Sequence, residues 1–163
     1  HQDQLKNERR IISHAMDEPD IDRVLDKDGN KYSISEALEK QIDWVQIDKG
    51  FLSEQEKETV LDSCKYAVTN GSHTVMGEIL GNHAKPIIGI PIYDEHTNQI
   101  KWAQEKKLGL IAHNRDQIIQ AIHKIKSDYD DFQDSVNEFS KNFNGNGAEN
   151  TAKIISELLQ DTK

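Results

Sequence analysis

Residues 66–78 read YAVTNGSHTVMGE, and residues 85–99 read KPIIGIPIYDEHTNQ. In each segment an apolar run, typical of a buried β-strand, ends in a turn rich in polar residues. The first turn holds Gly71 and leads directly into a helical pattern. A strand, a glycine turn and a helix in succession are typical of the βα units of a parallel sheet. These two segments therefore predict an α/β fold.

The same alternation of strands and helices extends along most of the chain. The strand candidates are residues 10–13, 43–47, 65–69, 86–92 and 108–112. The helix candidates are two segments with capping boxes (Ser33 with Glu36, Ser53 with Glu56), residues 74–82, residues 97–107, a segment capped by Asn114, and residues 128–143 and 148–159. Strands that are apolar throughout predict a Rossmann-like, three-layer fold, with a parallel sheet covered by helices on both faces.

Composition limits the class of protein. A chain of 163 residues suits one domain, and a net charge of −9 argues against nucleic acid as a partner. Cys64 is the single cysteine, so no intrachain disulfide can form, which fits a reducing compartment. The longest apolar runs are too short to span a bilayer, and no signal core follows the first residues. We therefore expect a cytoplasmic protein.

Ligands of parallel α/β sheets bind beyond the carboxyl ends of the strands. The segments at these ends are residues 70–74, 93–99 and 113–115. The first segment makes the strongest site, because Gly71 permits a tight turn and Ser72 to Thr74 open a helix with unpaired N–H groups. Those donors and the helix dipole favour an anion. Gly and Ser are also common in purely structural βα turns, and His113 could equally border a pocket or flank a helix cap.

The ordered motifs TNGSHTVMGE, KPIIGIP and DEHTNQ resemble the donor-binding half of GT-B glycosyltransferases. This group contains the bacterial N-acetylglucosaminyltransferase of lipid II synthesis, and UDP-glucuronosyltransferases and galactolipid synthases share the pattern. The resemblance runs from about residue 43 to the C-terminus, where NGAENTAKIISELL resembles the closing helix of the family. It implies a donor-binding domain over residues 43–163. Residues 1–42 form a segment of open role, which could belong to the same domain.

The resemblance also implies the residues that bind the donor. Gly71 and Ser72 match the turn whose amides hold the diphosphate, with His73 and Thr74 beside them at the head of the helix. Glu78 matches the acidic residue that binds the ribose hydroxyls, since two carboxylate oxygens can accept from vicinal hydroxyls.

The sugar and the base of the donor fall on other segments. Glu95 and His96 match the pair that contacts the sugar hydroxyls, and Gln99 lies where the family usually has Asn. Uracil is expected on the main chain near Ile47 or Phe51.

The resemblance further implies a UDP-sugar, such as UDP-N-acetylglucosamine or another UDP-hexose, and an inverting transfer without a cofactor or a metal ion. The acceptor domain of the family is not part of this sequence, so we expect the general base outside this chain, on an acceptor-binding domain or subunit. Peripheral membrane association would come through that missing half. Asn70 departs from the His that many relatives carry, and the opening Gly-rich strand of the family is not recognisable before Asp43.

Other interpretations stay open. A UDP-sugar 2-epimerase shares the scaffold, and a non-catalytic interaction module could keep the fold. Residues 26–30 (DKDGN) open like a calcium-binding loop, but Lys31 stands where that loop needs Gly, so a hairpin between residues 23–25 and 32–34 is expected. The histidines have no metal-ligand spacing, and we expect no metal site.

Overall fold

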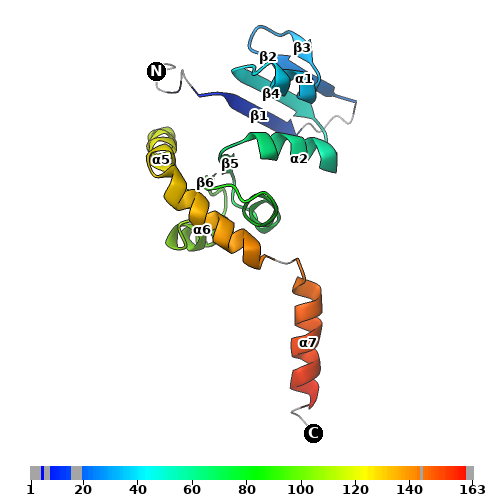
Figure 1. Cartoon of the computed structure of the whole chain (residues 1–163), viewed down its shortest axis with the longest axis vertical. Helices are drawn as coiled ribbons and strands as arrows, with labels where there is room; N and C mark the ends of the chain where they lie inside the picture. The colour runs from blue at the N-terminus through cyan, green and yellow to red at the C-terminus, as the bar shows by residue number, and fades with distance from the viewer. Residues whose placement is uncertain (1–4, 6–7, 16–19, 144, 161–163) are drawn as a thin grey trace.

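Two separate β-sheets organise the chain in the computed structural model, which describes residues 5, 8–15, 20–143 and 145–160 (Figure 1). Sheet A has the order β1-β4-β2-β3 and contains β1 (Arg10–Ala15), β2 (Asp22–Asp26), β3 (Lys31–Tyr32) and β4 (Trp44–Lys49). Sheet B has the order β5-β6-β7 and contains β5 (Ala67–Thr69), β6 (Ile87–Gly89) and β7 (Gly109–Ile111). Sheet B is wholly parallel, whereas sheet A is mixed.

Helices occupy most of the remaining described chain. They are α1 (Ile34–Glu39), α2 (Glu54–Ser63), α3 (His73–Met76), the π-helix η2 (Gly77–Asn82), α4 (Asp94–Glu105), α5 (Arg115–Ser127), α6 (Tyr129–Asn142) and α7 (Gly147–Gln160). Both predicted capping boxes are present at the starts of α1 and α2. Asn114 caps α5 as predicted, because its side chain accepts from the N–H of Gln117.

Sheet B confirms the predicted three-layer α/β arrangement. Successive residues of a strand point to opposite faces, and the first two residues of β6 do so. Ile87 packs with α3, η2 and α4, while Ile88 packs with α5 and Phe132 of α6. Both isoleucines are fully buried. The short strands 65–69, 86–92 and 108–112 of the prediction correspond to β5, β6 and β7.

Sheet A differs from the single parallel sheet that the sequence predicted. The predicted strand 43–47 is β4, which lies in sheet A and pairs with β1 in parallel and with β2 in antiparallel orientation. The reason is the hairpin of β2 and β3, which was predicted and turns the chain back beside β4. Asp26 closes this turn by accepting from the N–H groups of Asp28 and Asn30, both at 2.9 Å. The predicted boundary after residue 42 therefore falls inside sheet A.

Helix α2 joins the two sheets. Val60 belongs to the core of sheet A, and the neighbouring Leu61 packs against the core of sheet B. Asp62 at the end of α2 lies 2.9 Å from Nδ1 of His83, which follows η2. The two halves of the body are thus connected by packing and by polar contacts on one helix.

Helix α4 begins three residues before the predicted position, and β6 ends before the predicted residue 92. The ladder stops where Pro91 offers no N–H to continue it. Just before Pro91, the N–H of Ile90 still donates a hydrogen bond to the carbonyl of Thr69 in β5, at 2.7 Å. Glu95 and His96 therefore lie in the first turn of α4 rather than in a loop.

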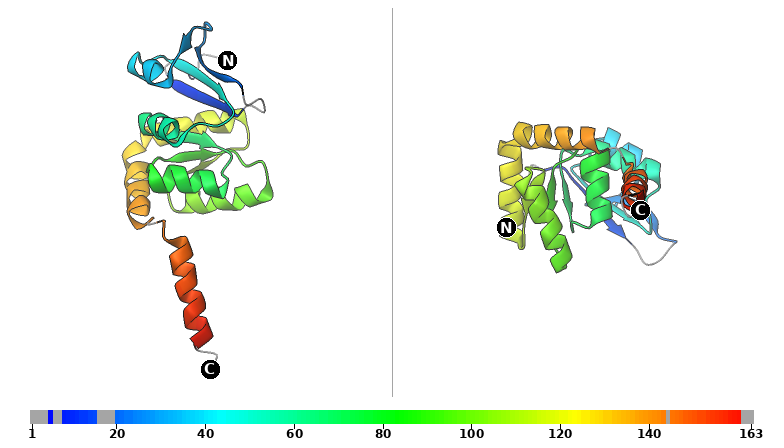
Figure 2. Two further views of the ribbon diagram at one scale, coloured as in Figure 1. Left: turned by 90° about the vertical axis from the view of Figure 1, so that its right-hand side faces the viewer. Right: turned by 90° about the horizontal axis from the view of Figure 1, so that it is seen from below.

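Helix α7 extends away from the rest of the described chain (Figure 2). Each of its side chains from Gly147 to Leu159 is exposed. Four large apolar side chains are more than half exposed: Ile154, Ile155, Leu158 and Leu159. None of the described helices has the length and hydropathy needed to cross a bilayer.

Candidate functional site

The turn between β5 and α3 has the backbone that the sequence predicted. Gly71 adopts a positive φ of 80°, and a Cβ at this position would lie 2.5 Å from side-chain atoms of Ile100 on α4. Only glycine fits both requirements without strain. The turn is therefore held tightly against the first part of α4.

Two of the predicted anion donors are already used within the turn. The N–H of Ser72 donates to Oδ1 of Asn70 at 3.1 Å, and the N–H of Gly71 lies 3.4 Å from Oγ1 of Thr69. His73 and Thr74, in the first turn of the helix, are exposed. A ligand at this turn would take the amides of residues 73 and 74 directly, and would replace the long, weak contact to Gly71.

Helix α4 supplies the most unusual side chains of this region. His96 and Gln99 are only 8% and 9% exposed. Nδ1 of His96 and Oε1 of Gln99 are buried and have no hydrogen-bond partner among the described residues. A buried polar atom without a partner costs about 1–3 kcal/mol. A ligand that supplied these hydrogen bonds would recover that energy.

The predicted sugar-binding residues lie on one helix and are in part linked. Nε2 of Gln99 donates to Oε1 of Glu95 at 2.9 Å, so an exposed carboxylate orients a buried amide. The ring of Tyr93 packs edge-on against the ring of His96, with centroids 5.2 Å apart. Gly71 contacts the same turn, because its added Cβ would lie 3.7 Å from the carbonyl of His96. The structure therefore brings the Gly71 turn and His96 together.

Glu78 lies in the first turn of η2, the helical segment that follows α3. Its Oε1 lies 2.9 Å from Nζ of Lys57 on α2, and the same ammonium lies 2.9 Å from Oε1 of Glu54. The hydrogen bond to Glu78, with that to Glu54, raises the pKa of Lys57. Among the described residues, the ion-pair partner of Glu78 is therefore on α2, and no hydrogen bond joins Glu78 to Glu95, His96 or Gln99.

The two residues expected near uracil differ in how exposed their side chains are. The side chain of Ile47 is 1% exposed within the core of sheet A, whereas Phe51, just beyond β4, is 91% exposed. Of the two, the segment around Phe51 is the one that a ligand could reach.

The segment after β7 is a helix cap in this structure. Oδ1 of Asn114 accepts from the N–H of Gln117 at 3.0 Å, and Oε1 of Gln117 accepts from the N–H of His113 at 2.7 Å. These reciprocal bonds account for the polar residues at this position.

Sequence reasoning missed a polar cluster on sheet A. Asp48 is almost fully buried, and its carboxylate contacts Nδ1 of His14 at 3.0 Å, Nε of Arg23 at 2.8 Å and the amide of Gln46. The guanidinium of Arg23, with Gln46 and His14, lowers the pKa of Asp48 to about 2. The partners lie 34 and 25 residues away in sequence, so no local pattern reveals the cluster.

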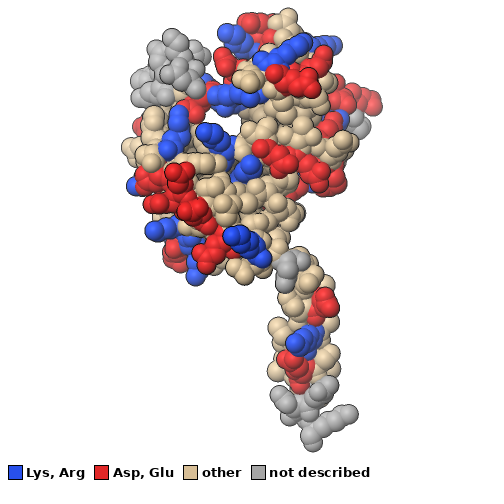
Figure 3. All heavy atoms as spheres, in the orientation of Figure 1, with Lys and Arg blue, Asp and Glu red and all other residues tan. Residues whose placement is uncertain are grey.

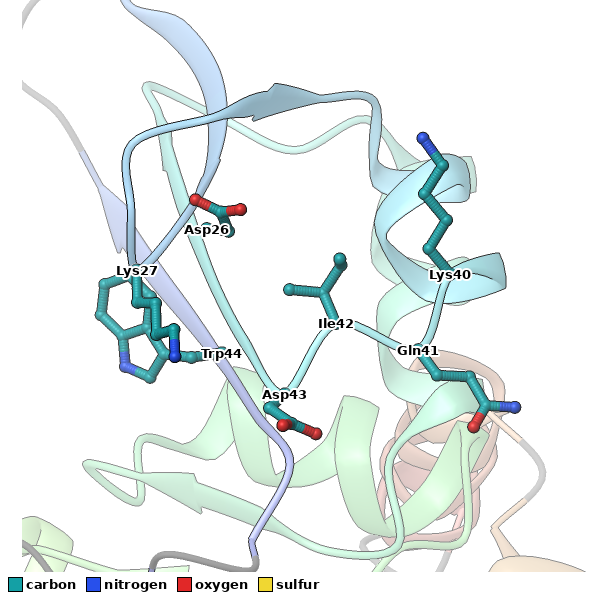
Figure 4. Close-up of a pocket in the computed structure, with 7 residues that line it drawn as sticks. All are labelled: Asp26, Lys27, Lys40, Gln41, Ile42, Asp43 and Trp44. Carbon is teal, nitrogen blue, oxygen red and sulfur yellow. The ribbon is translucent and has the colours of Figure 1, made fainter.

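A hollow of about 290 Å³ lies at the opposite end of β4, where the strand begins (Figure 4). It is lined by Asp26, Lys27, Lys40, Gln41, Ile42, Asp43 and Trp44. Oδ2 of Asp26 already accepts from Asn30 and Tyr32. The hollow contains none of the predicted donor-binding residues. The described part of the chain also holds no group of three or more His, Cys, Asp or Glu side chains arranged for a metal ion.

Comparison with protein-family models gives no match, and no curated protein is matched by sequence. Solved structures do match. One is the crystal structure of the glycotransferase of kitacinnamycin, with a TM-score of 0.56 and 12% sequence identity. The alignment covers 90% of this chain and 42% of that one, so the present chain spans less than half of the matched protein. At this identity the likeness shows that the two chains share a fold.

Proposed function

We propose that this chain is the donor-binding part of a UDP-sugar-dependent, inverting glycosyltransferase. The observation that carries the proposal is a pair of buried atoms with no hydrogen-bond partner among the described residues, Nδ1 of His96 and Oε1 of Gln99. Both belong to α4, the helix that packs against the Gly71 turn through Ile100 and the main-chain carbonyl of His96. A positive-φ glycine turn at a helix start suits a diphosphate. Buried polar atoms next to it suit a ligand that carries hydroxyl groups close to the phosphates.

For the individual residues we propose the roles that the resemblance implies. The amides at the start of α3 would hold the diphosphate, with His73 and Thr74 beside it, and Glu78 would accept from the ribose hydroxyls. Glu95, His96 and Gln99 would contact the sugar. The expected position of uracil is the main chain near Phe51.

In the proposed reaction an acceptor hydroxyl oxygen attacks the anomeric carbon of the sugar from the face opposite the diphosphate. The bond between that carbon and the diphosphate oxygen breaks, and UDP leaves. The proton of the hydroxyl passes to a general base on an acceptor-binding domain or subunit. Backbone donors at the start of α3 would stabilise the charge that develops on the diphosphate, without a metal ion.

Calorimetric titration without added metal tests the proposal. UDP, UDP-N-acetylglucosamine and UDP-glucose are expected to bind this chain, and ADP is not. Glu95→Ala is expected to leave UDP affinity unchanged and to weaken the UDP-sugar, because Glu95 would contact only the sugar. Binding of no uridine ligand, or equal binding of ADP and UDP, would contradict the proposal.

A further inference from the structure

Lys57 of α2 is a lysine held between two carboxylates from different parts of the chain. Glu54, one helical turn earlier, is 84% exposed, whereas Glu78 comes from η2 and its side chain is 24% exposed. An exposed pair on one helix contributes little to stability. The contact with the partly buried Glu78 is the one that can fix a geometry.

Lys57 forms an ion pair with one carboxylate oxygen of Glu78 and leaves the second oxygen available as an acceptor. Nζ lies 2.9 Å from Oε1, and Oε2 has no partner among the residues that the structure describes. A carboxylate that is paired at one oxygen can still accept hydrogen bonds at the second. The side chain of Lys57 is itself 30% exposed, so it is packed rather than free in solvent.

Helix α2 and the segment of α3 and η2 meet through apolar packing as well as through polar contacts. Leu61 of α2 packs against the core that contains Met76, Ile79 and Leu80, and Asp62 pairs with His83, which follows η2. This packing places the two backbones, and the ion pair with Lys57 holds one oxygen of the Glu78 carboxylate at the other end of the helical segment from the Gly71 turn.

We propose that Lys57 is a positioning residue that orients the Glu78 carboxylate for the 2′-hydroxyl of a ribonucleoside diphosphate. This inference rests on the proposed function and adds a residue that determines selectivity for ribose over deoxyribose. Lys57 acts through Glu78 and need not touch the ligand. Its positive charge also offsets that of Glu78, which would otherwise repel the diphosphate.

The test compares dissociation constants for UDP and 2′-deoxy-UDP. The wild-type chain is expected to prefer UDP by about tenfold, the scale of a hydrogen bond to a charged group. Glu78→Gln should remove most of this preference. Lys57→Met, which keeps the length of the side chain, should also reduce it to about twofold, mainly by weakening UDP. Lys57→Arg, which keeps the positive charge, should retain the wild-type preference for UDP.

Two controls separate selectivity from charge and folding. Lys153→Met removes the same charge from the exposed α7 and should leave both dissociation constants unchanged. Lys57→Gln repeats the test with a polar side chain in case the methionine variant does not fold, and the unfolding midpoint of each variant is measured alongside.

The possible failures can be told apart. If Lys57→Met and Lys57→Gln keep the wild-type preference while Glu78→Gln loses it, the positioning role is overturned and the proposed function stands. A wild-type chain that binds UDP and deoxy-UDP equally overturns the positioning role as well. A wild-type chain that binds neither ligand overturns the proposed function and this inference with it.

Discussion

Sheet A has strands of two to six residues and sheet B has strands of three, and the two sheets are also buried differently. In sheet B both faces of β6 are buried, with Ile87 packed against α4 and Ile88 against α5. In sheet A, Val45 and Ile47 of β4 face an apolar core, whereas Asp48 belongs to a polar cluster with the half-exposed His14 and Arg23. Sheet B is held by apolar packing on both faces, and sheet A by packing on one face and charge on the other.

The largest expected effect comes from a cavity in either core. Ile100→Ala in the core of sheet B should lower the free energy of unfolding by about 2–5 kcal/mol, because Ile100 is fully buried. Ile47→Ala is the matched change in sheet A. Trp44 lies in sheet A and Trp102 on α4, so single-tryptophan variants report the two regions separately.

Both tryptophans are expected to follow one transition in each variant, since α2 packs against both cores. Separate midpoints for Trp44 and Trp102 would show instead that the two sheets unfold independently.

A smaller loss of stability is expected when a glycine is replaced by alanine. Gly71 and Gly29 have nearly the same positive φ, 80° and 83°, but a Cβ on Gly71 would collide with Ile100 while one on Gly29 meets open space. Gly71→Ala should therefore cost about 1–3 kcal/mol more than Gly29→Ala, as measured by denaturant unfolding. Equal losses would mean that Ile100 moves aside at no cost.

Acid should distinguish the two sheets. Hydrogen bonds lower the pKa of Asp48 and of Glu56 to about 2, mainly those from Arg23 and from Lys49 respectively. A carboxylate whose pKa is lower in the folded state stabilises the fold above its unfolded pKa, and this stability is lost as pH falls from about 4.5 to about 2. The expected loss is about 1–2 kcal/mol for Asp48, after allowance for its half-exposed partners.

The measurement is native-state hydrogen exchange as a function of pH, which detects local opening below the one global transition. Protection of the sheet A amides should fall first, and Asp48→Asn should flatten the pH dependence. Equal acid sensitivity of β4 and β6 would contradict this assignment.

The smallest expected effect is at a helix cap. Ser53→Ala removes the side chain that caps α2 and accepts from Glu56, at an expected cost of about 1 kcal/mol. Ser33→Ala is the matched change at α1. Because α2 contacts both cores and α1 contacts that of sheet A, thermal unfolding of the Ser53 variant should shift both tryptophan signals.

The sequence predicted sheet B and the Gly71 turn well, because each βα unit depends on a short, continuous segment with its own glycine or helix cap. It predicted the hairpin of sheet A for the same reason. It did not predict that β4 pairs with that hairpin, nor the contact of Lys57 with Glu78, because these depend on residues that are 19 to 27 positions apart. The surface charge could be anticipated: acidic and basic side chains are interspersed on the face in Figure 3.

Helix α7 has a consequence for how unfolding of this chain is observed. It has 14 helical residues, those from Gly147 to Leu159 are exposed, and an isolated helix of that length is marginal in water. Heating should therefore reduce the far-ultraviolet circular dichroism gradually, before the cooperative loss of tertiary structure that the tryptophans report. Helical content and cooperativity are then two different observables in one small protein, and a single melting curve would mix them.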